Sequence, residues 1–278
     1  MYTEKSVDLK RDFYARYGQT SGRLFFKKMG LPCIIFDGGK NSLMLTLDCG
    51  VRVYGRQYGD VLKVLNCDTN VCDVHFVKNG KGAQILYSVD IPDVKGMKDT
   101  VLYAINSVLW EMGSTGRLMG EYDTVALCER YAPYGWCALK EGDTVKSIPM
   151  PLGDYNIILM RTRRNRLVAS AELTDRFHIS EYERIKASVM GLKECRTDTF
   201  FDMVNESQKS IERLLSPSEE LLWGINAVRS ADGVCASKIC SCGIIAFCEK
   251  DRTDSAIIRI NNEYKSAMGY SPNLAVVK

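Results

Sequence analysis

The sequence predicts an α+β protein, and three observations carry this prediction. Hydrophobic residues make up 46% of the 278 residues and charged residues 26%, which is ordinary globular usage and excludes disordered or collagen-like chains. Short apolar or alternating runs separated by turn signals fill residues 23–77, which is the pattern of β-strands. Helical spacing follows from about residue 99, and the second half mixes both patterns again.

The first half begins with a helix and continues with strands. Leu9, Phe13 and Tyr17 recur every four residues, Thr3 is a candidate cap, and Gly18 ends the helix. The expected strands cover residues 23–27, 33–36, 42–54, 61–66 and 71–77. Two helices follow, at about residues 99–112 and 121–131.

A break rich in Pro and Gly separates this half from the next. It runs from Pro133 to Pro151, and we therefore expect an N-terminal domain of residues 1–150 and a C-terminal domain of residues 151–278. In the second half, the expected strands cover residues 155–161, 167–173, 234–237, 243–249 and 274–277. The expected helices cover residues 181–192, 198–215, 218–229 and 253–268, the last ended by Gly269.

Charge and cysteine usage restrict the partners and the compartment. The 37 basic and 34 acidic residues nearly cancel, so we expect neither nucleic acid nor a membrane as partner. No run approaches the roughly 20 apolar residues of a membrane span, and the first residues lack the apolar run of a signal peptide. We expect a cytoplasmic protein whose eleven cysteines are reduced thiols.

Several stretches resemble, in order, the motifs of one enzyme family. Residues 203–208 resemble an M-N-x-S-H helix, with Gln208 at the position of the His. Residues 233–246 resemble a G-A-R-M-T-G-A-G-F-G-G-C-A-I-A hairpin, and residues 264–272 resemble the closing helix and strand of the family. The stretches that continue the likeness near the start are residues 13–23, residues 47–51 and Arg56. The chain is similar in these motifs to the galactokinases of the GHMP small-molecule kinase superfamily.

This resemblance implies a two-domain fold. The N-terminal domain would be of the type of domain 2 of ribosomal protein S5, and the C-terminal domain would be ferredoxin-like. In that family ATP and a sugar meet between the two domains, so an active member would use Mg-ATP. Sugar phosphorylation needs donors for phosphate, a carboxylate at the sugar hydroxyl and a cation for the transferring phosphoryl group.

The two glycine-rich loops of the family are altered in this chain. The family's phosphate loop corresponds to residues 91–100, where Gly96 and Thr100 keep the register and Lys95 and Lys98 would attract phosphate. Two aspartates in the same loop would repel phosphate, and we favour a solvated surface turn. In the second loop, the residues that replace glycines are Lys238, Cys240 and Cys242, whereas Gly243 remains.

The cysteines of this second loop allow two interpretations. Cys235, Cys240 and Cys242 are either metal ligands or small residues that fill former glycine positions. We favour the second interpretation and expect no metal site, because no standard ligand spacing is met.

The catalytic base of the family is missing, and this carries the functional prediction. Glu141 is a substitute carboxylate in one alignment, whereas in the alignment that we favour the whole base segment is deleted. Arg23 keeps the place of the catalytic cation, and Asp37 with Gly38 stands where the family binds sugar. A further basic turn contains Arg161, Arg163, Arg164 and Arg166. It could bind phosphate or nucleic acid, or it could be a solvated turn, and we favour the solvated turn.

The resemblance therefore implies a galactokinase-like protein that has lost sugar phosphorylation and binds a small-molecule sugar, another metabolite or a protein. The alternative is an active divergent kinase that uses Glu141 as base, Arg23 as cation and Lys95 or Lys98 on phosphate.

Overall fold

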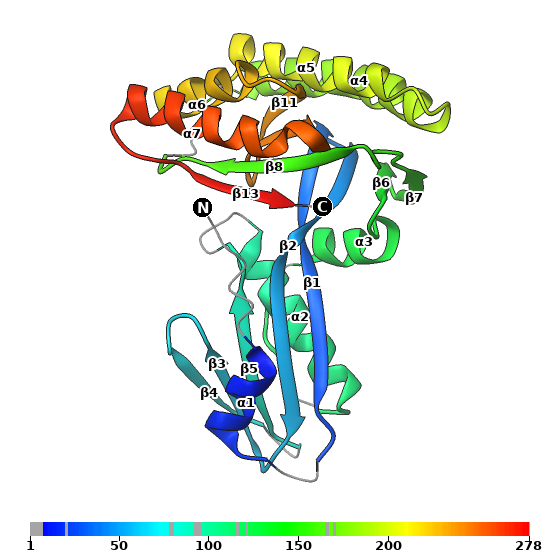
Figure 1. Ribbon diagram of the computed structural model, residues 1–278. Helices are drawn as coiled ribbons and strands as arrows, with labels where there is room; N and C mark the ends of the chain where they lie inside the picture. The colour runs from blue at the N-terminus through cyan, green and yellow to red at the C-terminus, as the bar shows by residue number, and fades with distance from the viewer. Residues whose placement is uncertain are drawn as a thin grey trace. The chain divides into compact units, whose positions relative to one another are not determined.

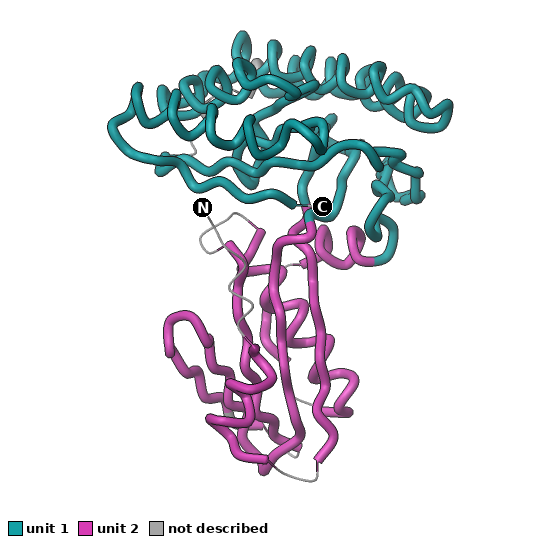
Figure 2. The backbone as a smooth tube through the Cα atoms, viewed as in Figure 1, with its two compact units in different colours: residues 1–2, 33–47, 130–278 teal, residues 3–32, 48–129 magenta. Residues whose placement is uncertain are grey.

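The computed structural model describes residues 8–19, 22–77, 81–91, 96–114, 117–120, 122–164, 167–168 and 171–277. The chain divides into two compact units (Figure 2). Unit 1 comprises residues 1–2, 33–47 and 130–278, and unit 2 comprises residues 3–32 and 48–129. This division differs from the expected boundary at residue 150, because the long strands β1 (Phe25–Gly38) and β2 (Asn41–Gln57) contribute to both units.

Unit 2 is a mixed sheet with helices on it (Figure 1). Its other elements are α1 (Leu9–Tyr17), β3 (Val61–Asn66), β4 (Cys72–Phe76), β5 (Ala83–Val89) and α2 (Met97–Glu111). The second half of β2 pairs antiparallel with β5, β5 pairs parallel with β3, and β3 pairs antiparallel with β4. Leu86 of β5 packs with Leu9 and Phe13 of α1, while the neighbouring Ile85 lies near Val108 of α2. Successive side chains of a strand point to opposite faces, so β5 is covered on both sides.

Unit 1 contains a four-stranded antiparallel sheet in the order β11-β12-β8-β13, and helices α4 to α7 pack around it (Figure 1). The helices are α3 (Asp123–Tyr131, shared with unit 2), α4 (Ala171–Lys193), α5 (Thr197–Leu214), α6 (Glu219–Arg229) and α7 (Thr253–Met268). The strands are β6 (Trp136–Glu141), β7 (Thr144–Pro149), β8 (Tyr155–Arg161), β9 (Leu167–Val168), β10 (Ser216–Pro217), β11 (Val234–Cys240), β12 (Gly243–Glu249) and β13 (Asn273–Val277), with a 3-10 turn at Lys250–Arg252.

The central strand β12 explains why this sheet is stable. Ile244 and Ala246 join the core with α6 and α7, whereas Phe247 lies on the opposite face against Phe200 of α5. Six consecutive residues of β12 are buried. The first half of β2 extends unit 1 separately by pairing with β6, which pairs with β7.

The α+β class is confirmed, and the differences from the expected elements have local causes. The first two expected strands are parts of one strand, β1, and the strand expected at 167–173 gives way to α4 from residue 171. The sequence prediction missed β5, and it missed the β6–β7 hairpin in the Pro- and Gly-rich break. Asp8 caps α1 by accepting a hydrogen bond from the Arg11 N–H at 3.1 Å, and Thr3 lies outside the described residues. None of the described helices is long and apolar enough to cross a bilayer.

Close contact between β1 and β2 makes one glycine indispensable. A Cβ atom on Gly50 would lie 2.0 Å from the carbonyl oxygen of Met29. We expect Gly50→Ala to lower the free energy of unfolding by about 3 kcal/mol, because backbone atoms must move. Gly153→Ala is the matched control, since a Cβ there meets nothing within 4 Å. Urea unfolding of both variants tests this, and an unchanged midpoint for Gly50→Ala would contradict it.

Candidate functional site

The β11–β12 hairpin, where the sequence analysis places a degraded glycine-rich loop, is the centre of a buried polar network in unit 1. The hairpin closes with Cys240 opposite Gly243. Gly243 has φ +135°, and a Cβ atom there would lie 2.5 Å from the carbonyl oxygen of Met160 on β8. Close packing against β8 is therefore enough to require glycine at this position.

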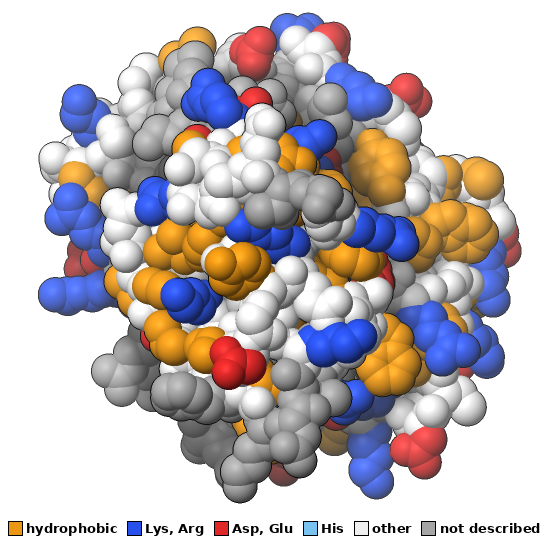
Figure 3. Space-filling model, turned by 90° about the horizontal axis from the view of Figure 1, so that it is seen from below, with side chains coloured by type: hydrophobic (Ala, Val, Ile, Leu, Met, Phe, Trp, Pro, Cys, Tyr) orange, Lys and Arg blue, Asp and Glu red, His pale blue; other side chains and the backbone are white. Residues whose placement is uncertain are grey.

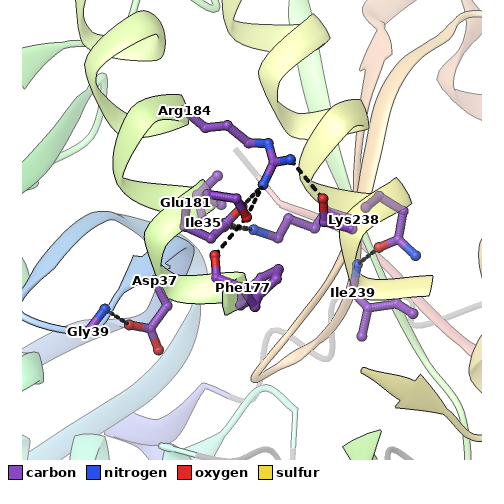
Figure 4. A network of polar contacts seen from close by, with 11 residues as sticks. Ile35, Asp37, Gly39, Phe177, Glu181, Arg184, Lys238 and Ile239 are labelled. Atoms are coloured by element: carbon purple, nitrogen blue, oxygen red, sulfur yellow. Dashed lines mark hydrogen bonds and ion pairs between the residues drawn. The ribbon is translucent and has the colours of Figure 1, made fainter. Parts of the chain in front are cut away.

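Lys238 of β11 points into this network (Figure 4). Its Nζ donates to Glu181 Oε2 at 2.7 Å and also to the carbonyl oxygen of Ile35 on β1. The other carboxylate oxygen, Glu181 Oε1, accepts from Arg184 at 2.9 Å, and Arg184 donates to Ser210 Oγ on α5 at 2.7 Å. Lys238 is 3% exposed and Glu181 is 0% exposed. Buried charges are stable only when they are paired and hydrogen-bonded, and both conditions are met here.

Aromatic rings complete the surroundings of the Lys238 ammonium group. The Nζ atom lies 4.7 Å from the ring centroid of Phe36 and 5.8 Å from that of Phe177, within the range of cation–π attraction. A carboxylate, a carbonyl and two rings thus share this ammonium group. It is engaged inside unit 1, so Lys238 serves packing and charge compensation there.

Side-chain amides from α5 complete the edge strand β11. Asn205 donates to the Cys235 carbonyl at 3.0 Å and accepts from the Ser237 N–H at 3.2 Å. Gln208 accepts from the Ile239 N–H at 2.7 Å. Edge strands expose unpaired backbone groups, and these amides satisfy three of them. In the sequence, Gln208 stands where the resembled family has a histidine, but this contact could not be predicted from the motif.

The N-terminus of α2 keeps only part of the expected phosphate loop. Gly96 is the residue before the helix and is left-handed, with φ +87°. Thr100 is fully buried, and its hydroxyl donates to the Gly96 carbonyl at 2.8 Å, so the hydroxyl is used within the helix. Lys98 is exposed, and Lys95 lies outside the described residues.

The two residues expected in catalysis have structural partners. In unit 2, the Arg23 guanidinium lies 4.7 Å from the centroid of the Phe25 ring. In unit 1, Glu141 ends β6 on the surface and accepts from Lys146 Nζ at 3.2 Å. This exposed ion pair with Lys146 is a surface contact within the β6–β7 hairpin.

The expected sugar-contact residues, Asp37 and Gly38, end β1 just before the turn at residues 39–40 that joins it to β2. Asp37 Oδ1 accepts from the Gly39 N–H at 3.0 Å, which is a local turn contact (Figure 4). A Cβ atom on Gly38 would lie 3.3 Å from both the His178 carbonyl oxygen and the Tyr182 nitrogen of α4. The turn therefore packs on α4, and Gly38 is enclosed by backbone.

The basic turn after β8 makes contacts within unit 1. The Arg163 guanidinium lies 3.7 Å from the centroid of the Tyr270 ring. Glu220 of α6 accepts from the Arg164 N–H at 3.0 Å and from Tyr270 Oη at 2.6 Å. Arg161 lies in β8, and Arg166 lies outside the described residues. These contacts give the turn a structural role.

A polar groove lies between α5 and β11 of unit 1. It has a volume of about 600 Å³, and its charged lining residues are Asp202, Glu206, Lys209 and Arg229. Lys209 pairs with Glu206 at 2.6 Å, and Arg229 pairs with Glu212 at 2.8 Å. Over the described residues, no group of three or more His, Cys, Asp or Glu side chains is arranged to hold a metal ion.

The structure has the fold of the GHMP small-molecule kinases. The structure is similar to that of Lactococcus lactis galactokinase in complex with galactose. The similarity covers 98% of this chain and 97% of the galactokinase chain, with a TM-score of 0.73 and 14% identity. Mevalonate kinase of Staphylococcus aureus is similar over 91% of this chain and 98% of its own, with a TM-score of 0.62 and 10% identity.

Homoserine kinase of Cytophaga hutchinsonii is similar over 94% of this chain and 96% of its own, with a TM-score of 0.61 and 13% identity. No protein-family model matches the chain, and no curated protein matches it in sequence. The predicted two-domain fold is therefore confirmed. At these identities the likeness concerns the fold, and the activity has to be argued from the residues.

The buried ion pair generates a stability prediction. Glu181→Gln leaves Lys238 and Arg184 without a counter-charge, and we expect it to cost about 3–5 kcal/mol. Lys238→Met should cost less, because Glu181 keeps Arg184. The controls are Glu206→Gln and Lys209→Met, which disrupt an exposed i,i+3 pair within α5 and should change stability by less than about 1 kcal/mol. Equal urea midpoints for Glu181→Gln and Glu206→Gln would contradict the prediction.

The Glu220 cluster predicts a pH dependence. Burial acts to raise the pKa of Glu220, but hydrogen bonds from Tyr270 and from the backbone N–H groups of Arg164 and Arg163 outweigh it and lower the pKa. A lowered folded-state pKa stabilises the protein above the unfolded-state pKa, and the stabilisation is lost as the pH falls through the folded-state pKa. We expect Tyr270→Phe to cost about 2 kcal/mol at pH 7 and to flatten the loss of stability between about pH 5 and pH 3.

Unfolding measured across this pH range tests the effect. Tyr134→Phe is the control, because Tyr134 is 73% exposed. Parallel curves for Tyr270→Phe and the wild type would show that Glu220 does not depend on this hydroxyl group.

Proposed function

We propose that this chain is a catalytically inactive protein with a GHMP-kinase fold, which acts by binding a metabolite or a partner protein. The observation that carries the proposal is the buried Lys238–Glu181 pair in the β11–β12 hairpin. In the resembled family this hairpin is glycine-rich, which lets the backbone approach a ligand closely. Here Lys238, with Cys242 beside it in the turn, fills the interior of unit 1 with side chains.

The other motifs support the same conclusion. The Thr100 hydroxyl is used within α2, Glu141 is exposed beside Lys146, and Arg23 lies over a phenyl ring. A kinase active site needs donors directed at phosphate and a carboxylate at the acceptor hydroxyl. The described residues at these positions are directed elsewhere, and the hairpin does not fit a nucleotide phosphate.

The polar groove between α5 and β11 supports a small polar ligand. Its volume of about 600 Å³ is within the usual range of roughly 300–1,000 Å³ for small-molecule sites. Figure 3 shows Lys and Arg side chains scattered among hydrophobic ones on the face that it draws, instead of one continuous basic surface. On this face, the distribution lacks the clustered basic patch that is typical of nucleic-acid binding.

One observation favours the alternative, an active divergent kinase that uses Mg-ATP. Gly96 keeps the left-handed position before α2, and the N-terminus of a 15-residue helix attracts phosphate. In that case Glu141 would be the base, Arg23 the cation, and Lys95 or Lys98 the phosphate ligand.

Kinase assays distinguish the two functions. We expect ADP release from Mg-ATP to stay at background with galactose and with a panel of monosaccharides, mevalonate and homoserine. Arg23→Ala should give the same background. Substrate-dependent ADP release that is lost in Arg23→Ala would falsify the inactive assignment.

Thermal shift tests binding in the groove. A ligand at about 100 times its dissociation constant adds about 2.7 kcal/mol, which corresponds to a rise in Tm of about 5–10 °C. We expect Lys209→Ala to reduce the shift given by a polar metabolite, because Lys209 lines the groove. Lys186→Ala is the matched control, since Lys186 is also an exposed lysine in a helical i,i+3 pair. A shift that survives Lys209→Ala unchanged would place the ligand elsewhere.

A further inference from the structure

The polar groove between α5 and β11 contains one charge that the described part of the protein leaves uncompensated. Both basic residues of its lining are paired. Lys209 lies 2.6 Å from Glu206, and Arg229 lies 2.8 Å from Glu212. Asp202 also lines the groove and is exposed, but it forms no ion pair with any described residue. The charge that remains to be neutralised in the groove is therefore negative, and it attracts a positively charged ligand group.

A second polar group of the groove lacks a partner. Ser237 of β11 lines the groove and is 1% exposed. Its hydroxyl oxygen is buried and makes no hydrogen bond within the described structure. The neighbouring Asn205 amide already bonds with the backbone of β11. A buried hydroxyl group without a partner is unfavourable, so a ligand group that bonds with it would be stabilised.

The spacing of these two groups follows from the direction of the two elements. Asn205 of α5 bonds with the backbone of Cys235 and Ser237, and further along both elements Gln208 bonds with that of Ile239. Helix α5 and strand β11 therefore run in the same direction. The unpaired carboxylate precedes Asn205 by almost one helical turn, so it and the Ser237 hydroxyl lie at levels about 8 Å apart along the groove. One ligand can reach both groups only if its polar groups are several bonds apart.

The charges around Cys235, which also lines the groove, have the same sign as that of Asp202. Burial raises the pKa of the Cys235 thiol, and the negative charges of Glu249 and Asp198 raise it further. Asp198 and Asp202 are four residues apart on α5, and like charges at this spacing repel each other. A cation bound at Asp202 would reduce this repulsion.

An organic ammonium group fits these surroundings better than a metal ion. Among the described residues, no three ligating side chains are arranged to hold a metal. An ammonium group has three N–H donors and needs only one carboxylate to compensate its charge. The Ser237 hydroxyl can both donate to and accept from a hydroxyl group at the other end of the ligand. The volume of about 600 Å³ accommodates a molecule of the size of a monosaccharide.

We propose that the groove binds a small amino polyol, with its protonated amine on the Asp202 carboxylate and a hydroxyl group on Ser237 Oγ. The inference rests on the proposed function, in which the groove binds a small polar ligand, and it adds the chemical class of that ligand. Asp202 selects an amine over a neutral polyol, and Ser237 holds the other end of the molecule.

Matched probes test the proposal on the full-length protein. The amines are glucosamine and glucamine, and their neutral counterparts are glucose and sorbitol. Affinities are measured by isothermal titration calorimetry at about pH 6.5, where such amines are protonated. We expect each amine to bind at least about tenfold more tightly than its neutral counterpart, because a charge-assisted hydrogen bond is stronger than a neutral one.

Three variants assign the roles. Asp202→Asn should weaken binding of the amines at least about tenfold and leave that of the neutral polyols unchanged, so the preference for amines disappears. Ser237→Ala should weaken binding of amines and neutral polyols alike, without lowering the melting temperature of the free protein, because the hydroxyl has no partner among the described residues. Asp175→Asn is the matched control, since Asp175 is an exposed aspartate of another helix, α4, and all affinities should stay unchanged.

The wild-type protein alone is enough to overturn the proposal, so failure of a variant to fold would not protect it. Absence of binding by both amines, or equal affinities for amines and neutral polyols, would overturn it. A preference for amines that survives Asp202→Asn would overturn the assignment of Asp202.

Failure of this inference and failure of the proposed function give different results. If neutral polyols bind as tightly as amines and Lys209→Ala weakens both, the groove binds a polar ligand but does not select an amine. Substrate-dependent ADP release, by contrast, would refute the proposed function whatever the groove prefers.

Discussion

Glu181 carries a negative charge on a side chain without exposed surface, and the arrangement of unit 1 depends on compensating that charge. Lys238 brings β11 to the carboxylate and reaches the Ile35 carbonyl of β1, while Arg184 links the same carboxylate to Ser210 of α5. An uncompensated buried charge costs several kcal/mol, so none of these elements can shift without the others. The network therefore couples α4, α5, β11 and the second half of β1.

The need to compensate the buried charge of Glu181 also explains why the β11–β12 hairpin carries a buried lysine. A glycine-rich turn leaves room for a ligand at the backbone, whereas this turn directs a lysine and thiols into the interior. The side-chain amides of Asn205 and Gln208 form hydrogen bonds with backbone groups of β11, which is the edge strand of the sheet and the first strand of the hairpin. The hairpin has become a packing element, and Gly243 is required by its contact with β8. The substituted residues Lys238 and Cys242 are buried, so they fill the interior of unit 1 with side chains.

The sequence predicted elements where the local signal was strong. Helix α7 and its end at Gly269, which is left-handed with φ +77°, were predicted from periodicity and one glycine. Strand β5 was missed because nearly all its residues are buried, so it lacks the alternation that marks a half-exposed strand. The β6–β7 hairpin was missed because its Pro and Gly residues resemble a linker. Alternation of apolar and polar residues identifies a strand that is buried on one face only. It fails to identify a strand that is buried on both faces or on neither.

The candidate site could be predicted only in part, for the same reason. By itself, the sequence determined the α+β class, the order of elements in the second half, and the replacement of hairpin glycines by Lys238 and two cysteines. Only the tertiary structure decided that Lys238 meets Glu181 and that Cys242 meets Cys33, 209 residues away. Spacing along a chain specifies neighbours on one helix or strand. Partners from distant segments are specified by how whole elements pack, and that packing determines whether a substituted residue is exposed, paired or reactive.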